Sequence, residues 1–149
     1  MKVKEIFDVA SRIESVGYSY YRKMSEGVGQ ANAELFRQLA EEERQHREKF
    51  EGIYEDLAGT AEAGRGTWEE QEVGDQLRYL AELSIFPKLE EDDPPRDYEE
   101  ALNHAIGVEK DSIIFYDGLR YLFKDEDPLE KIIAEERKHM MKLMLEKKA

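Results

Sequence analysis

Residues 39–50 read LAEEERQHREKF, and as a helix this stretch carries an acidic residue on its apolar side. At about 100° per residue, Glu43 shares its face with apolar and aromatic side chains, namely Phe36, Leu39, Ala40, Phe50, Tyr54 and Leu57. His46 lies one turn further along, about 60° round the helix. The chain therefore places a Glu and a His on a face that a helix normally buries.

The same anomaly occurs in three other helical segments. Glu14 and Glu109 each lie on an apolar face of their own segment, and a fourth apolar stripe contains Glu136 and His139. Six residues are therefore predicted to point inward from four helices: Glu14, Glu43, His46, Glu109, Glu136 and His139.

The inward acids are also predicted to lie at one level. The two acids of the first hairpin are equally far from the glycine-flanked break at residues 27–29. Those of the second hairpin are equally far from residues 122–123, close to the 124–128 loop. Each hairpin therefore places its two Glu side chains side by side.

The sequence also repeats itself. ASRIESVGYSYY at 10–21 matches AIGVEKDSIIFY at 105–116, and EERQH at 42–46 matches EERKH at 135–139. The repeat indicates two copies of a helical hairpin that face each other across a pseudo-twofold axis.

Four inward carboxylates at one level need cations. Burying bare carboxylates is prohibitively costly, and like charges this close would force protonation. Two divalent cations would offset four negative charges, and two imidazoles would complete the ligand set. One Glu from each of two helices, with Glu-x-x-His from each of the other two, is the pattern of di-iron and di-manganese carboxylate bundles. The spacing of three residues places both Glu-x-x-His side chains on one helix face.

The periodic pattern predicts one all-α domain, residues 1–149. Its four long helices are expected at about 3–25, 31–58, 98–122 and 128–147. The connection at 59–96 is too long for a tight turn, and we expect a short helix at 76–86 within it. Such a crossover can return along the bundle, which is the arrangement of a ferritin-like four-helix bundle of two antiparallel hairpins. We expect Trp68 to pack under the crossover and His104 to be exposed.

Composition excludes several classes of function. The net charge of −13 and the pI near 4.7 argue against a nucleic-acid or anionic-membrane partner. No stretch approaches the roughly 20 apolar residues of a membrane span, and the charged N-terminal segment does not resemble a signal peptide. With no cysteine, disulfides and iron–sulfur clusters are excluded. A cytoplasmic location is therefore expected.

ESVGYSYY, EERQH, EKDSIIFY and EERKH resemble the rubrerythrin branch of the ferritin-like superfamily, and the resemblance covers nearly the whole chain. It implies two iron ions bridged by Glu43 and Glu136. The remaining four ligands would divide between the metals, Glu14 with His46 and Glu109 with His139.

Three further features bear on this resemblance. Tyr21 and Tyr116, each seven residues after a terminal Glu, resemble tyrosines that hydrogen-bond ligating carboxylates, although ordinary core packing is the alternative. Rubrerythrins proper carry a rubredoxin module with four cysteine ligands, so in this cysteine-free chain the electrons would come from elsewhere. They also carry an extra Glu three residues after the ligand of the third helix, where this chain has Ser112.

Together these features predict a di-iron redox protein that reacts Fe(II) with O2 or hydrogen peroxide. It would be an oxidoreductase of the peroxidase or ferroxidase type with an external electron donor, and would form a homo-oligomer, in the first place a dimer. Manganese is an alternative metal, and another divalent ion could occupy the site in a crystal. Three alternative functions are an iron-binding or storage protein, an O2-dependent oxygenase on a small organic substrate and a metal-free helical interaction module.

Overall fold

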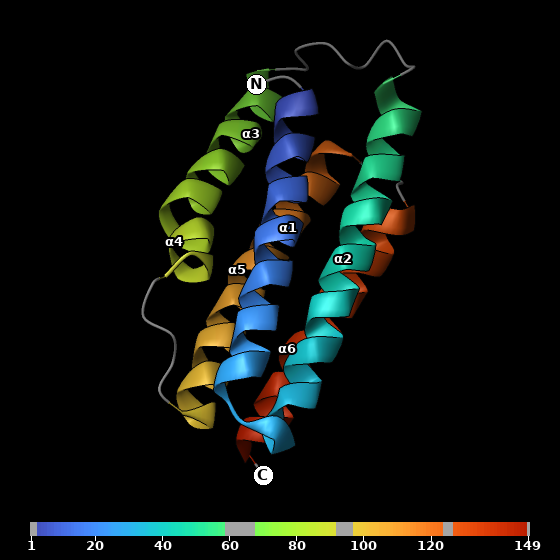
Figure 1. Cartoon of the computed structure of the whole chain (residues 1–149). Coiled ribbons are helices and arrows are strands. Elements are labelled where there is room, and N and C mark those ends of the chain that lie inside the picture. The colour runs from blue at the N-terminus through green and yellow to red at the C-terminus, as the bar shows by residue number, and fades with distance from the viewer. Residues whose placement is uncertain (1–2, 59–67, 92–96, 124–126, 149) are drawn as a thin grey trace.

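The computed structural model describes residues 3–58, 68–91, 97–123 and 127–148, and within them all regular secondary structure is helical. Four long helices form a bundle (Figure 1): α1 (Val3–Gly27), α2 (Gln30–Ala58), α5 (Tyr98–Leu122) and α6 (Asp127–Lys148). The predicted ends of these helices differ from the observed ones by two residues at most. The expected all-α bundle is therefore confirmed.

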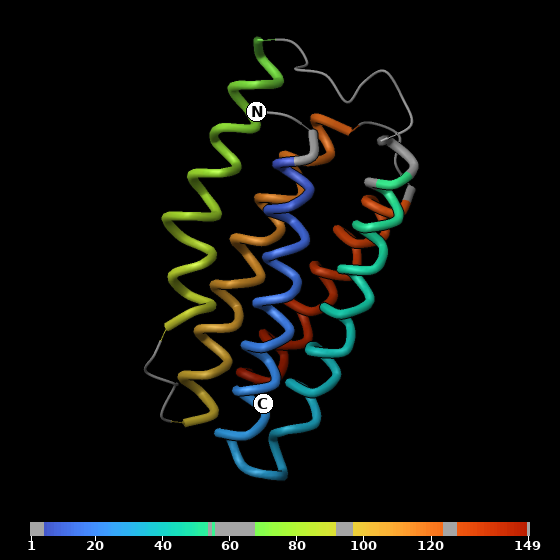
Figure 2. The backbone as a smooth tube through the Cα atoms, turned by 45° about the horizontal axis from the view of Figure 1, so that its top comes forward, coloured from blue at the N-terminus to red at the C-terminus, as the bar shows by residue number. Residues whose placement is uncertain are grey.

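The bundle consists of two antiparallel hairpins, α1 with α2 and α5 with α6. Helices α2 and α5 run in one direction, and α1 and α6 run in the other (Figures 1 and 2). In the first hairpin the chain reverses at Gly29, whose φ of +84° is a left-handed conformation that glycine adopts at little cost. The expected return of the crossover along the bundle, which makes the second and third long helices parallel, is confirmed.

A cap fixes the start of α5. The side chain of Asp97 accepts a hydrogen bond from the backbone N–H of Glu100 at 2.8 Å, as expected for an N-cap residue. This cap stabilises the helix that contributes Glu109 to the bundle interior.

The crossover contains a longer helical segment than the sequence predicted. It comprises α3 (Trp68–Leu80), a π-helical turn η1 (Ala81–Ile85) and α4 (Phe86–Leu89), and residues 59–67 and 92–96 of the crossover lie outside the described part of the chain. The prediction of 76–86 missed the first turns because they are polar and show no apolar stripe. Acidic residues at the N-terminal end, Glu69 and Glu70, favour helix formation there through the helix dipole.

The π-helical turn has a local cause in Pro87, the second residue of α4. Proline has no N–H, and in a regular helix its ring would clash with the carbonyl four residues earlier. The wider turn comes directly before this position, and the N–H of Phe86 reaches back five residues to the carbonyl of Ala81. The helix therefore continues through the proline.

The crossover helix packs against α1 and α5 (Figure 1). Leu77 lies against Gly118 of α5, where an added β-carbon would be only 2.4 Å from Leu77 Cδ2. Lys88 donates a hydrogen bond of 2.7 Å to Asp111. Trp68 is 76% exposed, so the prediction that it packs under the crossover is wrong. No helix in the described ranges combines the length and the apolar character needed to cross a membrane.

Candidate metal centre

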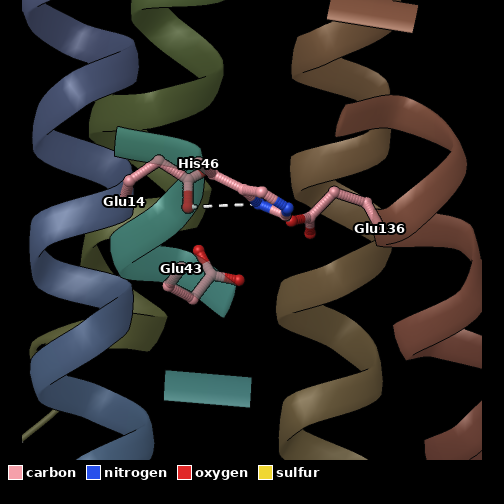
Figure 3. Close-up of side chains that lie close together, drawn as sticks. All are labelled: Glu14, Glu43, His46 and Glu136. Carbon is pink, nitrogen blue, oxygen red and sulfur yellow. Dashed lines mark ion pairs between the residues drawn. The ribbon is translucent and has the colours of Figure 1, made fainter. Parts of the chain in front are cut away.

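The six inward-pointing residues are all buried in the middle of the bundle. None is more than 5% exposed, and Glu14 and His46 are completely buried. They come from all four long helices: Glu14 from α1, Glu43 and His46 from α2, Glu109 from α5, and Glu136 and His139 from α6. Figure 3 shows four of them converging from α1, α2 and α6.

The six side chains form two overlapping groups, in each of which one potential ligand atom per residue lies within 4.8 Å of the others. One group consists of Glu14, Glu43, His46 and Glu136, and the other of Glu43, Glu109, Glu136 and His139. Glu43 and Glu136 belong to both. The geometry thus provides two adjacent sites with two carboxylates between them.

Several atoms that face this cluster are buried without a hydrogen bond. They are Glu14 Oε2, His46 Nδ1, Glu109 Oε2, Glu136 Oε1 and His139 Nδ1. His46 Nδ1 lies 2.9 Å from Glu136 Oε1 and 3.7 Å from Glu14 Oε2, the contact drawn in Figure 3. Since buried polar atoms are normally paired, oxygen and nitrogen atoms gathered in this way fit a bound cation.

Both histidines turn Nδ1 toward the cluster and Nε2 toward an acid on the opposite helix. His46 of α2 hydrogen-bonds Glu135 of α6, and His139 of α6 pairs with Glu42 of α2. The hydrogen bond with His139 lowers the pKa of Glu42, and the pKa of Glu135 is also lowered because the contact with His46 outweighs the effect of its burial. An ionised carboxylate at Nε2 favours a proton there and leaves Nδ1 free to bind a metal.

Sequence reasoning missed Glu42 and Glu135, because on a helix they turn away from the ligand face. The signal was nevertheless present. Both residues begin the repeated EER-x-H segments, directly before Glu43 and Glu136. Both copies of the repeat have Glu at this position, although it lies outside the apolar stripe. Such identity indicates that the residue has a role beyond packing.

The two tyrosines also cross between the hairpins. The hydroxyl of Tyr21 on α1 donates to Glu109 Oε1 on α5 at 2.5 Å, and the hydroxyl of Tyr116 on α5 donates to Glu14 Oε1 on α1. Both tyrosines are at most 1% exposed. Each terminal acid therefore has one oxygen held by a tyrosine and the other, Oε2, without a hydrogen bond.

Burial and crowding dominate the electrostatics of the cluster. Burial raises the pKa of Glu43 well above its usual range, and the charges of Glu136 and Glu14 raise it further. Burial and the nearby charge of Glu136 likewise raise the pKa of Glu109. Burial would lower the pKa of His46, but the neighbouring carboxylates of Glu136 and Glu14 outweigh it and raise this pKa to about 11. Without a cation, Glu43, Glu109 and His46 therefore hold their protons more strongly than exposed groups of the same type do.

The family model for rubrerythrin matches residues 5–147. The chain belongs to the rubrerythrin family. A crystal structure of a proposed ferritin-like diiron-carboxylate protein from Thermotoga maritima is similar, with 27% sequence identity and a TM-score of 0.65. The similarity covers 99% of this chain and 95% of that one. No curated protein gave a significant match.

The resemblance drawn from the sequence places Ser112 where rubrerythrins proper carry an extra Glu, and in the structure this serine is buried. Ser112 stands three residues after Glu109 and is 5% exposed. A serine hydroxyl is shorter than a glutamate side chain and carries no charge. The position therefore adds no fifth acid to the cluster.

Proposed function

We propose that this protein binds two iron ions in the bundle and reacts Fe(II) with O2 or hydrogen peroxide. The observation that carries the proposal is the pair of overlapping four-residue groups that share Glu43 and Glu136. Glu14 and His46 would complete one coordination sphere, and Glu109 and His139 the other. Manganese would suit the same oxygen and nitrogen ligands.

The bound metals would supply the electrons and polarise the oxygen reactant. The protein side chains would set the geometry. Tyr21 and Tyr116 hold one oxygen of each terminal acid, which directs the other oxygen inward. Glu42 and Glu135 fix the imidazoles with Nδ1 toward the cluster.

The burial of the six clustered residues favours a small reactant over an organic substrate. A cavity of about 170 Å³ lies between α1 and the crossover helix, lined by residues that include Asp8, Arg12, Arg78 and Phe86. None of the six clustered residues lines it. Their burial suits O2 or peroxide, which can penetrate through small openings.

The electrons for a catalytic cycle would come from an external donor, because these 149 residues include no cysteine to hold an iron–sulfur or rubredoxin-type centre. Assembly as a homodimer is part of the proposal. Sedimentation of the metal-loaded protein measures the assembly state, and a closed shell would instead favour iron storage.

The decisive experiment is anaerobic titration of the metal-free protein with Fe(II), followed by addition of O2 or peroxide. We expect two Fe(II) per chain, and their oxidation should consume the oxidant. Glu43→Ala and Glu136→Ala should lose this stoichiometry, whereas Glu48→Ala, an exposed acid on α2, is the matched control. Uptake of one iron or none by the folded wild-type protein would overturn the proposal.

A further inference from the structure

A second set of polar side chains lies beside the candidate metal centre. Tyr20 of α1 is 8% exposed, and its hydroxyl lies 2.5 Å from His104 Nδ1 on α5. His104 Nε2 in turn lies 2.9 Å from Glu91 Oε2, just beyond α4. The side chain of His104 is 22% exposed, so the prediction of an exposed histidine is wrong.

The contacts of this histidine indicate where its protons lie. A buried hydroxyl proton needs an acceptor, and in the described part of the chain His104 Nδ1 is the partner of the Tyr20 hydroxyl. Tyr20 therefore donates to Nδ1. The proton of the neutral imidazole then lies on Nε2, facing the Glu91 carboxylate.

The pair is connected to the metal centre through Tyr21. The ring centroids of Tyr20 and Tyr21 are 5.0 Å apart, in an edge-on contact. The hydroxyl of Tyr21 donates to Glu109, one of the proposed metal ligands. A continuous series of contacts thus leads from Glu91, whose side chain is 54% exposed, to the cluster.

The internal repeat shows that packing does not require this pair. Tyr20 lies six residues after the acid of its copy, and the matching residue of the other copy is Phe115, which is completely buried. His104 lies five residues before its acid, and the matching residue is Val9. An aromatic and an aliphatic side chain fill the equivalent places, so the hydroxyl is an addition of the first half and the imidazole an addition of the second.

We propose that Tyr20 is a one-electron relay and that His104 is its proton acceptor. The inference rests on the proposed function, because the oxidant is the metal pair after its reaction with O2 or peroxide. Tyr20 loses one electron, which passes through Tyr21 and Glu109 and reduces that oxidant by one electron. Its O–H bond breaks as an N–H bond forms at His104 Nδ1. The products are a neutral tyrosyl radical and an imidazolium paired with Glu91, and an external one-electron reductant restores both.

Electrostatics are consistent with coupled loss of the proton and the electron. Burial, and then the charges of Glu109 and Glu91, raise the pKa of Tyr20 well above its usual range. The resting phenol therefore keeps its proton. Once oxidised, a phenol becomes a strong acid, and the hydrogen-bonded imidazole is placed to take the proton without movement of either ring.

The first test mixes the iron-loaded protein with hydrogen peroxide, freezes the mixture and records electron paramagnetic resonance. We expect a tyrosyl radical whose largest g value is lowered by a hydrogen bond from the His104 imidazolium. Tyr20→Phe should lose this radical with unchanged iron content. Tyr79→Phe, which removes an exposed tyrosine hydroxyl, is the matched control. An iron-oxidising wild type with no radical, or the same radical in Tyr20→Phe, would overturn the proposal.

A second variant separates proton transfer from structure. His104→Gln retains a hydrogen-bonding side chain but removes the base, so radical formation should slow roughly a hundredfold, a typical contribution of a general base. The largest g value should also rise, because no cation faces the phenoxyl oxygen. If His104 has only a structural role, the rate of radical formation and the largest g value stay as in the wild type, and the proposed proton transfer is overturned.

A test on the metal-free protein distinguishes this inference from the proposed function. A flash-excited ruthenium tris-bipyridine complex, with persulfate as terminal electron acceptor, oxidises tyrosines without iron. The wild type should give a higher yield of tyrosyl radical at neutral pH than Tyr20→Phe. Equal yields overturn the relay even if iron binds. A higher radical yield in the wild type supports the Tyr20–His104 pair whether or not iron binds. Failure to bind iron overturns only the proposed function.

Discussion

A β-carbon at Gly17 would lie 3.1 Å from Glu43 Oε2. Helix α1 therefore passes so close to this shared acid that glycine is the residue that leaves its carboxylate undisturbed. Gly17 stands three residues after Glu14, and Ser112 occupies the matching place in the second copy of the repeat. Small residues at both positions leave space for the cluster.

The close approach predicts opposite effects of Gly17→Ala on folding and on metal binding. Alanine favours the helix by about 0.5–1 kcal/mol, but its β-carbon displaces Glu43 by a few tenths of an ångström. We expect metal affinity to fall by about 10–100-fold, the usual effect of a change beside a ligand, while the stability of the metal-free protein rises by the gain in helix propensity. Competition titration and thermal unfolding measure the two effects.

Gly52→Ala is the matched control, because Gly52 is exposed on α2 and has nothing near an added β-carbon. It should raise stability by a similar amount and leave metal affinity unchanged. Wild-type affinity in Gly17→Ala would show that Glu43 moves freely or is no ligand.

The acids behind the histidines give a second prediction. Glu42→Gln and Glu135→Gln retain the size of the side chain but remove the charge that orients each imidazole. We expect each to lower metal affinity by about 10–100-fold and both together to lower it further. Isothermal titration with a redox-silent divalent cation measures this, with Glu41→Gln on the exposed side of α2 as control. Equal affinities in all variants would contradict the orienting role.

Metal uptake should release protons. The raised pKa values of Glu43 and Glu109, and the pKa of His46 near 11, favour the protonated forms of these groups in the metal-free protein. Ligands must lose those protons to bind a cation, so apparent affinity should rise with pH. Calorimetry in buffers of different ionisation enthalpy counts the protons released. Affinity that is constant between pH 6 and 8, roughly the range in which such ligands compete with protons, would contradict this.

The tight fit of the crossover helix predicts that Gly118→Ala destabilises the fold. The added β-carbon would lie 2.4 Å from Leu77 Cδ2, so the helix or the leucine must shift. Overpacking of this kind costs about 1–3 kcal/mol, more than alanine gains in helix propensity. Urea unfolding measures the loss. Gly107→Ala on the same helix, where the nearest atom is Lys88 Nζ at 3.9 Å, should show no loss.

The long helices and the inward acids could be predicted from sequence because both depend on local periodicity. An apolar stripe identifies the face that Glu43 shares, and equal distance from a turn predicts which residues lie level. Figure 3 shows the outcome for α1, α2 and α6. Burial and clustering of the six side chains follow from these two rules.

Features that depend on a partner element were not predictable in the same way. His104 lies off the apolar stripe of its own helix, and it is partly covered because Tyr20 and Glu91 approach it from other elements. Trp68 is apolar, yet nothing in its own segment shows that the crossover leaves it exposed. Sequence periodicity predicts which face of a helix is buried. Tertiary packing decides which residues of other elements contact that face.

The contacts around the cluster have an evolutionary implication, because each half of the chain completes the other. Tyr21 and Glu42 of the first hairpin contact an acid and an imidazole of the second. Tyr116 and Glu135 of the second hairpin contact an acid and an imidazole of the first. Two copies of one ancestral hairpin could have made the same contacts with each other in a homodimer. Gene duplication and fusion would later have joined the two copies in one chain. Every substitution in a symmetrical dimer occurs twice. Only after fusion could each half acquire a residue that its twin lacks, Tyr20 in the first half and His104 in the second.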